Sequence, residues 1–129
     1  MDATDRAKPL ADSELTGQLF EAISEAFNSK KLKRGANEST KSLNRDIAEL
    51  IILAADASPL EIILHLPLLC EDKNVPYIFV PSMAELGQAC GTTRHVIAAA
   101  IIKRIGEETS DQLKELKLAV EKCYYQTAE

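Results

Sequence analysis

The residues best suited to binding chemistry form a basic stretch between positions 30 and 45 of an otherwise acidic chain. The 129-residue chain has a formal net charge of −5, yet this stretch carries +5 and leaves −10 for the rest. Its cations are Lys30, Lys31, Lys33, Arg34, Lys41 and Arg45, and its one carboxylate is Glu38. Binding of an anionic partner depends on such local patches rather than on net charge, so the overall acidity does not exclude nucleic acid.

A helix start inside this stretch strengthens the case for anion binding. Gly35 precedes a pattern typical of a helix, and the unpaired amides and dipole at a helix N-terminus favour an anionic group. Lys41 and Arg45 are one turn apart on the predicted solvent face, near Asn37. The alternative is a lysine-rich helix face that only contacts water.

Glu38 makes a simple phosphate-binding surface an incomplete explanation, because a carboxylate repels phosphate. Guanine has hydrogen-bond donors on its base edge, and a carboxylate can accept from them where the edge is exposed. We therefore hypothesise that the cations hold an RNA backbone while Glu38 and Asn37 contact bases.

Patterns typical of catalysis are scarce in the rest of the chain. His65 and His95 are paired with no nucleophile by any motif, and no glycine-rich phosphate loop or metal-ligand spacing is present. Cys70, Cys90 and Cys123 lack C-x-x-C spacing and are expected to be reduced, buried thiols. We expect no cofactor and no metal, and a small α/β enzyme or metabolite binder that uses the cysteines remains the alternative.

Hydrophobic spacing predicts helices that alternate with strands. A first helix over 12–28 carries Leu15, Leu19, Ile23 and Phe27 on one face. The helix after Gly35 has an apolar stripe that continues by spacing through Ala36, Thr40, Leu43, Ile47 and Leu50. Strands are predicted over 50–56, 75–80 and 96–102, with one further strand at 32–34.

Three more helices are expected from capping and apolar spacing. Ser58, Pro59 and Glu61 form a capping box, and Pro67 must kink this helix or divide it in two. Ser82 and Glu85 repeat the capping pattern over 82–91, and a last amphipathic helix spans 109–125. Strands that alternate with helices predict an α/β layered domain with a mainly parallel or mixed sheet.

The chain length predicts a single domain, and the apolar runs are too short to predict a membrane span. A chain of 129 residues is typical of a single domain. We expect a flexible N-terminal tail over residues 1–11 and one domain over 12–129. No apolar run approaches the ~20 residues of a membrane span.

Several long motifs resemble one known family. They are "KRGANESTKSLNR", "LIILAADASPLEIILHLPLLCEDKNVPYIFVPS", "LGQACG" and "TTRHVIAAAI", within residues 10 to 102. The chain resembles the kink-turn RNA-binding family of ribosomal and snoRNP proteins related to archaeal ribosomal protein L7Ae. It looks most like the branch shared by the spliceosomal tri-snRNP and box C/D snoRNPs. The resemblance implies a three-layer α-β-α sandwich around a four-stranded mixed sheet.

The resemblance also implies roles for residues of the basic stretch. A kink-turn is a sharp bend of RNA that contains sheared G·A pairs. Gly35, Asn37 and Glu38 would meet these pairs, while Lys41 and Arg45 would contact the RNA backbone.

A second set of residues would enclose the base that is flipped out of the kink. These residues are Ile62, from the third helix, and Arg94 and Ile97, from the loop "GTTRHVI". An apolar wall is suited to an unstacked base.

Five positions depart from the family pattern. Glutamate is usual where Ser58 lies, lysine or arginine at Met83, a basic residue at Gln88, glycine at Asp46 and proline at His95. From these we predict kink-turn binding with relaxed identity at the flipped base or with lower affinity.

The resemblance implies a non-catalytic protein that nucleates the assembly of RNA–protein particles. Its expected partners are kink-turn RNA, as snRNA or box C/D snoRNA, and a second assembly protein of the same particle. We expect roles in pre-mRNA splicing and in rRNA processing and methylation, a nuclear and nucleolar location, and a monomer when free. The alternative within RNA binding is a ribosomal or H/ACA snoRNP relative.

Overall fold

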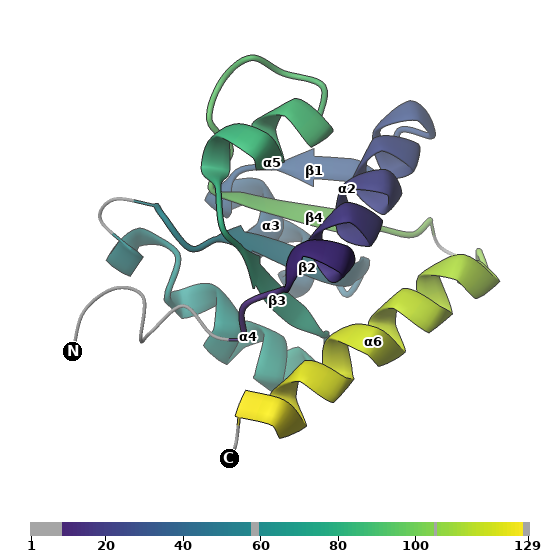
Figure 1. The fold of residues 1–129 in the computed structure, drawn as a ribbon. Helices are drawn as coiled ribbons and strands as arrows, with labels where there is room; N and C mark the ends of the chain where they lie inside the picture. Colours follow the sequence, from purple (N-terminus) through teal and green to yellow (C-terminus); the bar gives the residue numbers. More distant parts are fainter. Residues whose placement is uncertain (1–8, 58–59, 105, 128–129) are drawn as a thin grey trace.

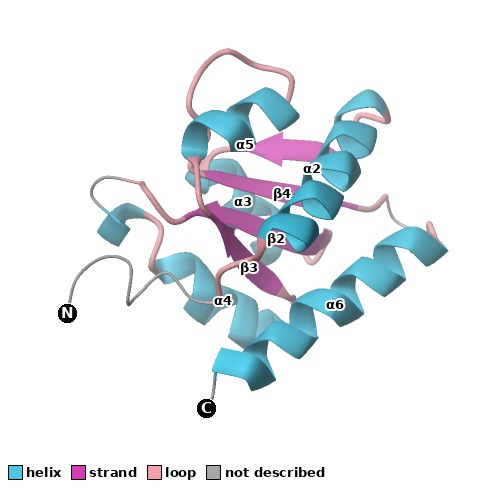
Figure 2. Ribbon diagram, in the orientation of Figure 1, coloured by secondary structure: helices cyan, strands magenta, loops and turns pink. Residues whose placement is uncertain are grey.

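The four strands form one mixed sheet with helices on both faces (Figures 1 and 2). The structure is a computed structural model that describes residues 9–57, 60–104 and 106–127. The strand order is β1 (Leu32–Arg34), β4 (Ala98–Ile102), β2 (Ala48–Ala54) and β3 (Tyr77–Val80). β4 is antiparallel to both of its neighbours, and β2 is parallel to β3. The predicted three-layer α-β-α sandwich around a four-stranded mixed sheet is confirmed.

Alternate residues of the central strands pack against helices on opposite faces. Ile52 packs with α2 (Ser13–Asn28), α5 (Met83–Ala89) and α6 (Asp111–Thr127). Ile51 packs with α3 (Ala36–Asn44), the 3-10 helix η1 (Leu60–Ile62) and α4 (His65–Lys73). Because both faces are covered, the central strands are apolar on both sides, which explains the continuous apolar runs in the sequence.

The first predicted helix is confirmed, with one error on its buried face. The carboxylate of Asp12 accepts a hydrogen bond of 2.8 Å from the Leu15 amide and caps α2. Phe27, predicted on the apolar face, is 42% exposed, and Ala26 is buried instead. A step of four residues overshoots one helical turn by about 40°. A series of such steps therefore drifts around the helix, and by the last turn its residue no longer faces the core.

The second predicted helix ends earlier than its apolar stripe suggested. α3 stops at Asn44, so the expected continuation through Ile47 and Leu50 is wrong. Asp46 has a positive φ of 59°, which turns the chain out of the helix, and Leu50 belongs to β2. The apolar residues after the turn are buried by the strand rather than by a longer helix.

The third predicted helix is divided, and the break lies ahead of its proline. η1 ends at Ile62 and α4 begins at His65, which places Pro67 in the first turn of α4. Amides in a first turn have no partner within the helix, so a proline costs no hydrogen bond there. The capping residues Ser58 and Pro59 lie outside the described residues.

The other predicted elements are confirmed with shifted ends. The Ser82 hydroxyl accepts from the Glu85 amide at 3.2 Å and caps α5 as expected. The three-residue strand before Gly35 also forms. β3, β4 and the helices α5 and α6 differ from their predicted ranges by at most two residues at their ends.

The outer edge of β3 is closed by two segments distant in the sequence. The Ala11 amide donates to the Phe79 carbonyl, and the Phe79 amide donates to the Pro9 carbonyl, each at 2.8 Å. Residues 9–11 are thus bound to the sheet, unlike the flexible tail expected there, whereas residues 1–8 lie outside the described part of the chain.

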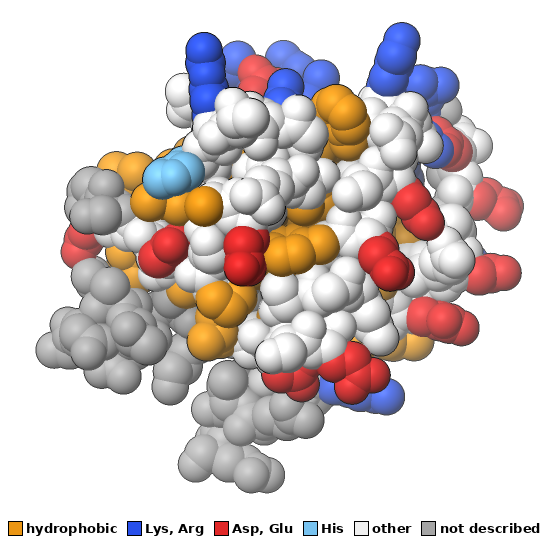
Figure 3. Space-filling view, turned by 45° about the horizontal axis from the view of Figure 1, so that its top comes forward, with side chains coloured by type: hydrophobic (Ala, Val, Ile, Leu, Met, Phe, Trp, Pro, Cys, Tyr) orange, Lys and Arg blue, Asp and Glu red, His pale blue; other side chains and the backbone are white. Residues whose placement is uncertain are grey.

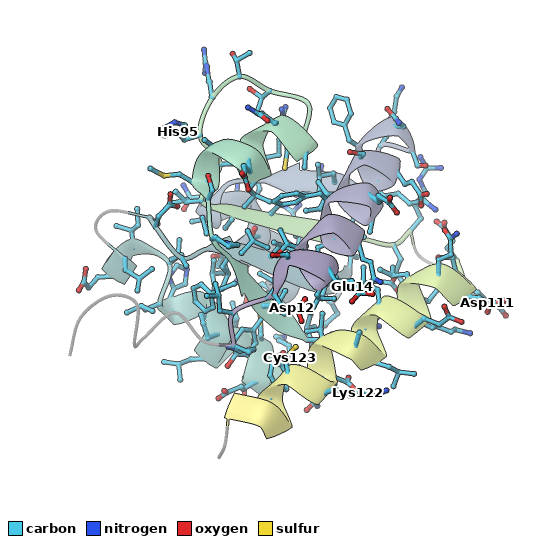
Figure 4. The ribbon with its side chains drawn as sticks, in the orientation of Figure 1. Asp12, Glu14, His95, Asp111, Lys122 and Cys123 are labelled. Atoms are coloured by element: carbon cyan, nitrogen blue, oxygen red, sulfur yellow. The ribbon has the colours of Figure 1, made fainter. Side chains whose placement is uncertain are left out.

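Tyr124 of α6 closes the same edge at Tyr77. Its hydroxyl donates to the Tyr77 carbonyl at 2.7 Å and accepts from the Tyr77 amide at 2.6 Å. The two ring centroids are 5.3 Å apart. This contact fixes α6 obliquely across the face that it shares with α2, and Cys123 points inward beside it (Figure 4). Burial raises the pKa of Tyr124 above its ordinary value.

Replacement of Tyr124 by Phe should lower the free energy of unfolding by about 1–3 kcal/mol, because two backbone groups of Tyr77 lose their partner. A tyrosine whose pKa is raised by folding contributes stability that is present below about pH 10 and lost as the pH rises further. The variant should therefore lose less stability than the wild type on titration above pH 10. Urea unfolding at several pH values measures both effects, and unchanged stability at neutral pH would contradict the assignment.

Candidate nucleic-acid interface

Four connections meet at one end of the sheet. β1 and β2 end there, β4 begins there, and β3 ends there because it is parallel to β2. The Gly35 amide donates to the Ala98 carbonyl at 2.7 Å, and the Ala54 amide donates to the Ile97 carbonyl at 2.9 Å. These bonds join the start of α3, the end of β2 and the loop before β4.

The start of α3 is open to a ligand. Gly35 is its N-cap, with φ 98° and ψ 158°, and no side chain caps the helix. A side chain at this positive φ would be strained, so glycine is needed for β1 to end and α3 to begin at one residue. The amides of the first turn have no partner within the helix, which makes them suitable donors to an anion.

The predicted polar face of α3 is on the surface. Asn37, Lys41 and Arg45 are exposed, and Glu38 is partly exposed. The Glu38 carboxylate lies 3.6 Å from the Lys41 ammonium, and these side chains are 43% and 56% exposed. Exposed pairs of this kind are weak, so both groups can change partners when a ligand arrives.

Side-chain contacts hold α3 against α4. The Thr40 hydroxyl donates to the Ala36 carbonyl at 2.8 Å and lies 3.0 Å from Nε2 of His65, the first residue of α4. His65 thus has a contact within the fold, and it is exposed at the start of α4.

The loop over residues 91–97 rests on α5 at a glycine. The Thr92 amide donates to the Gly87 carbonyl at 3.1 Å. A Cβ atom at Gly87 would lie 2.1 Å from the Arg94 carbonyl oxygen, so only glycine fits. Sequence reasoning missed this role, and its only signal was a glycine within a predicted helix.

The other end of the loop is held by Met83. The Val96 amide donates to the Met83 carbonyl at 3.1 Å, and the Met83 amide donates to the Asp56 carboxylate at 2.8 Å. Asp56 therefore connects the segment after β2 to the start of α5. Its position at the end of a predicted strand was its only sequence signal.

The residues expected around a flipped base come from two of these connections. Ile62 lies on η1 and is 46% exposed, which is high for an isoleucine. Arg94 is exposed on the loop, and Ile97 is half-buried where the loop joins β4. The expected neighbour Ser58 is outside the described residues.

Three of the family departures lie around the same loop. Met83 is half-buried against the core on the α2 face, Gln88 is exposed on α5, and His95 is exposed on the outer side of the loop (Figure 4). The fourth, Asp46, lies 3.4 Å from the Lys73 ammonium of α4. Asp46 thus has a cationic partner other than the neighbouring Arg45.

The charge of the surface is divided between regions. Figure 3 shows Lys and Arg side chains gathered along the upper edge of the molecule, with most of the Asp and Glu side chains in view below them.

We call the set Gly35, Asn37, Glu38, Lys41, Arg45, Ile62, Arg94 and Ile97 the candidate interface.

The described residues offer little to an enzyme. Burial raises the pKa of Cys70 to about 12 and that of Cys90 to about 11, so both thiols stay protonated and unreactive at neutral pH. Within residues 9–57, 60–104 and 106–127, no cluster of His, Cys, Asp or Glu is arranged to hold a metal ion. In the same ranges no helix has the length and apolarity to cross a membrane.

Comparison with known proteins identifies the family. Residues 17–110 match the Ribosomal protein L7Ae/L30e/S12e/Gadd45 family. The chain belongs to this family. It is a non-catalytic member of the family.

Three relatives illustrate the likeness. "Small nuclear ribonucleoprotein associated homolog 13" of Caenorhabditis elegans is 58% identical over 117 residues, 91% of each chain. "NHP2-like protein 1" of Xenopus tropicalis is 56% identical over 117 residues, again 91% of each chain. The structure of the "Giardia lamblia 15.5kD RNA binding protein" has a TM-score of 0.87 and 43% identity, and the match covers 95% of this chain and 99% of that one.

Replacement of Gly87 by Ala should lower the free energy of unfolding by about 1–3 kcal/mol, because the new methyl group displaces the loop. The matched control is Gly17→Ala in α2, where a Cβ meets nothing within 4 Å. That change should instead stabilise the protein by up to about 1 kcal/mol. Denaturant unfolding measures both, and amide exchange of residues 92–96 should rise only in the first variant. Equal effects in the two variants would contradict the role of Gly87.

Proposed function

We propose that this protein binds RNA through the candidate interface and recognises a kink-turn. The observation that carries the proposal is the uncapped start of α3 at Gly35, with exposed Asn37 beside it and partly exposed Glu38 in the first turn. A loop that carries Arg94 is joined to this start through the sheet. Amide donors, cations and one carboxylate are thus available together.

Each group of α3 has a suitable RNA partner. The first-turn amides, with Lys41 and Arg45, favour phosphates. Glu38 exchanges its exposed partner Lys41 for the donors of a guanine edge, which sheared G·A pairs leave accessible. The released Lys41 then pairs with the backbone. Asn37 has both donors and acceptors for the same base pairs.

The flipped base of the kink is proposed to lie between Ile62, Ile97 and Arg94. An exposed apolar side chain and a guanidinium are both suited to an unstacked base, and contacts of this type contribute about 1–3 kcal/mol. With Ser58, Met83 and His95 in place of the family's usual residues, this pocket has relaxed identity for the base or lower affinity.

Recognition of a bent RNA suggests a role in assembly. The protein, acting through a single domain, holds the kink and presents a combined protein–RNA surface to a second protein of the particle. It is a monomer when free and acts in the nucleus and nucleolus. Relatives named as ribonucleoprotein-associated proteins support this proposal.

Two classes of particle are candidates. The relative named as associated with a small nuclear ribonucleoprotein supports the spliceosomal and box C/D class, with roles in pre-mRNA splicing and in rRNA processing and methylation. The relatives named "NHP2-like protein 1" favour the second class, an H/ACA snoRNP or ribosomal relative. In either class the proposed RNA contact is the candidate interface.

Replacement of Glu38 by Ala should abolish the preference for a kink-turn over the same RNA with G·C in place of its G·A pairs. Replacement of Lys41 by Ala should keep that preference but weaken binding to both RNAs and reduce the salt dependence, because one phosphate contact is lost. Gel-shift titrations at several salt concentrations measure both. If Glu38→Ala keeps the full preference, the proposed base contact is wrong.

The RNAs bound in cells should separate the two classes of particle. Immunoprecipitation of the tagged protein, followed by RNA sequencing, should recover box C/D RNAs and tri-snRNP RNA in the first class. Recovery of H/ACA RNAs or mature ribosomes would exclude the first class and support the second. The Glu38→Ala variant serves as the control for recovery that depends on direct RNA contact.

A further inference from the structure

An exposed aromatic ring lies beside the candidate interface and has no role in it. Phe27, at the end of α2, is 42% exposed. Its ring lies beneath the guanidinium of Arg34, whose Cζ atom is 5.9 Å from the ring centroid. An aromatic ring paired with arginine on a basic surface is the combination that proteins use to stack unpaired bases.

The position of this ring is well defined. A Cβ at Gly91 would lie 2.8 Å from the Phe27 ring, so the ring rests on the backbone of that residue. The Arg34 guanidinium also donates to the Cys90 carbonyl at 3.5 Å. The ring and the guanidinium thus both lie against residues 90 and 91, at the start of the loop.

The same residues connect Phe27 to the candidate interface. Arg34 directly precedes Gly35, and Gly91 begins the loop that carries Arg94. Lys30, whose amide donates to the Phe27 carbonyl at 3.1 Å, is exposed and adds a second cation. An RNA strand that runs from the start of α3 along β1 would thus pass cationic side chains before it reaches the Phe27 ring.

We propose that Phe27, Arg34 and Lys30 form a second RNA contact, in which an unpaired base outside the kink stacks on the exposed ring. Arg34 and Lys30 neutralise the phosphates on either side of this base. The inference rests on the proposed RNA binding and extends it, because it makes a single-stranded flank of the kink-turn part of the ligand. Stacking selects no particular base, since every base has a π-face.

The test compares kink-turn RNAs with and without a short single-stranded extension, placed at either end in turn. With the wild-type protein one extension should tighten binding about 5-fold or more, which is the effect of about 1 kcal/mol of stacking. Phe27→Ala should remove this gain and leave affinity for the RNA without extension unchanged. An extension of abasic nucleotides, which keeps the phosphates, should give a smaller gain that depends on Arg34 and Lys30.

Two further variants test whether the gain depends on direct contact between the RNA and the ring. Leu118→Ala removes another exposed apolar side chain, 58% exposed on α6, and should keep the full gain. The chain contains no tryptophan, so Phe27→Trp introduces a single fluorophore at the ring. Its fluorescence should be quenched by the RNA with the extension and much less by the RNA with abasic nucleotides.

The outcomes are distinguishable. An equal gain in wild type and Phe27→Ala, or no gain from an extension at either end, overturns the inference and leaves kink-turn binding intact. If no extension tightens binding, the exposed Phe27 ring is instead a contact for a partner protein. Absence of binding to every kink-turn RNA would instead overturn the proposed function itself.

Discussion

Two backbone hydrogen bonds at the start of β4 hold the start of α3 and the end of β2 beside the loop over residues 91–97. One joins Ala98 to Gly35 and the other joins Ile97 to Ala54. The first is possible because Gly35 adopts a positive φ, so β1 ends and α3 begins without an intervening loop. The first-turn amides of α3 are thereby held beside the loop over residues 91–97. A longer connection between β1 and α3 would separate these amides from the loop.

The polar groups of this surface have only weak partners in the free protein. Glu38 and Lys41 form an exposed ion pair, and no side chain caps α3. Since an exposed pair costs little to break, the surface is prepared for a ligand without being strained. In contrast, the supports beneath it are firm. The loop is bonded to α5 at both ends, and α3 contacts α4 through Thr40 and His65.

The sequence predicted the layers and the local part of the site because both depend on short-range patterns. Capping by Ser82 and the surface position of Lys41 follow from spacing within one helix. The join between Ile97 and Ala54 depends on strand pairing across the sheet, which no local pattern shows. Ile62 was grouped with Ile97 only by resemblance to the family. The burial of Phe27 was predicted wrongly because four-residue spacing drifts around a helix of that length.

The most direct test of the account is an NMR titration of the protein with a kink-turn RNA, followed at the backbone amides. The largest shifts should occur at residues 35–38 and 94–97, because these amides lie where the RNA is proposed to bind. Shifts confined to the hollow between α2 and α6, lined by Glu21, Glu25 and Glu115 among others, would contradict it.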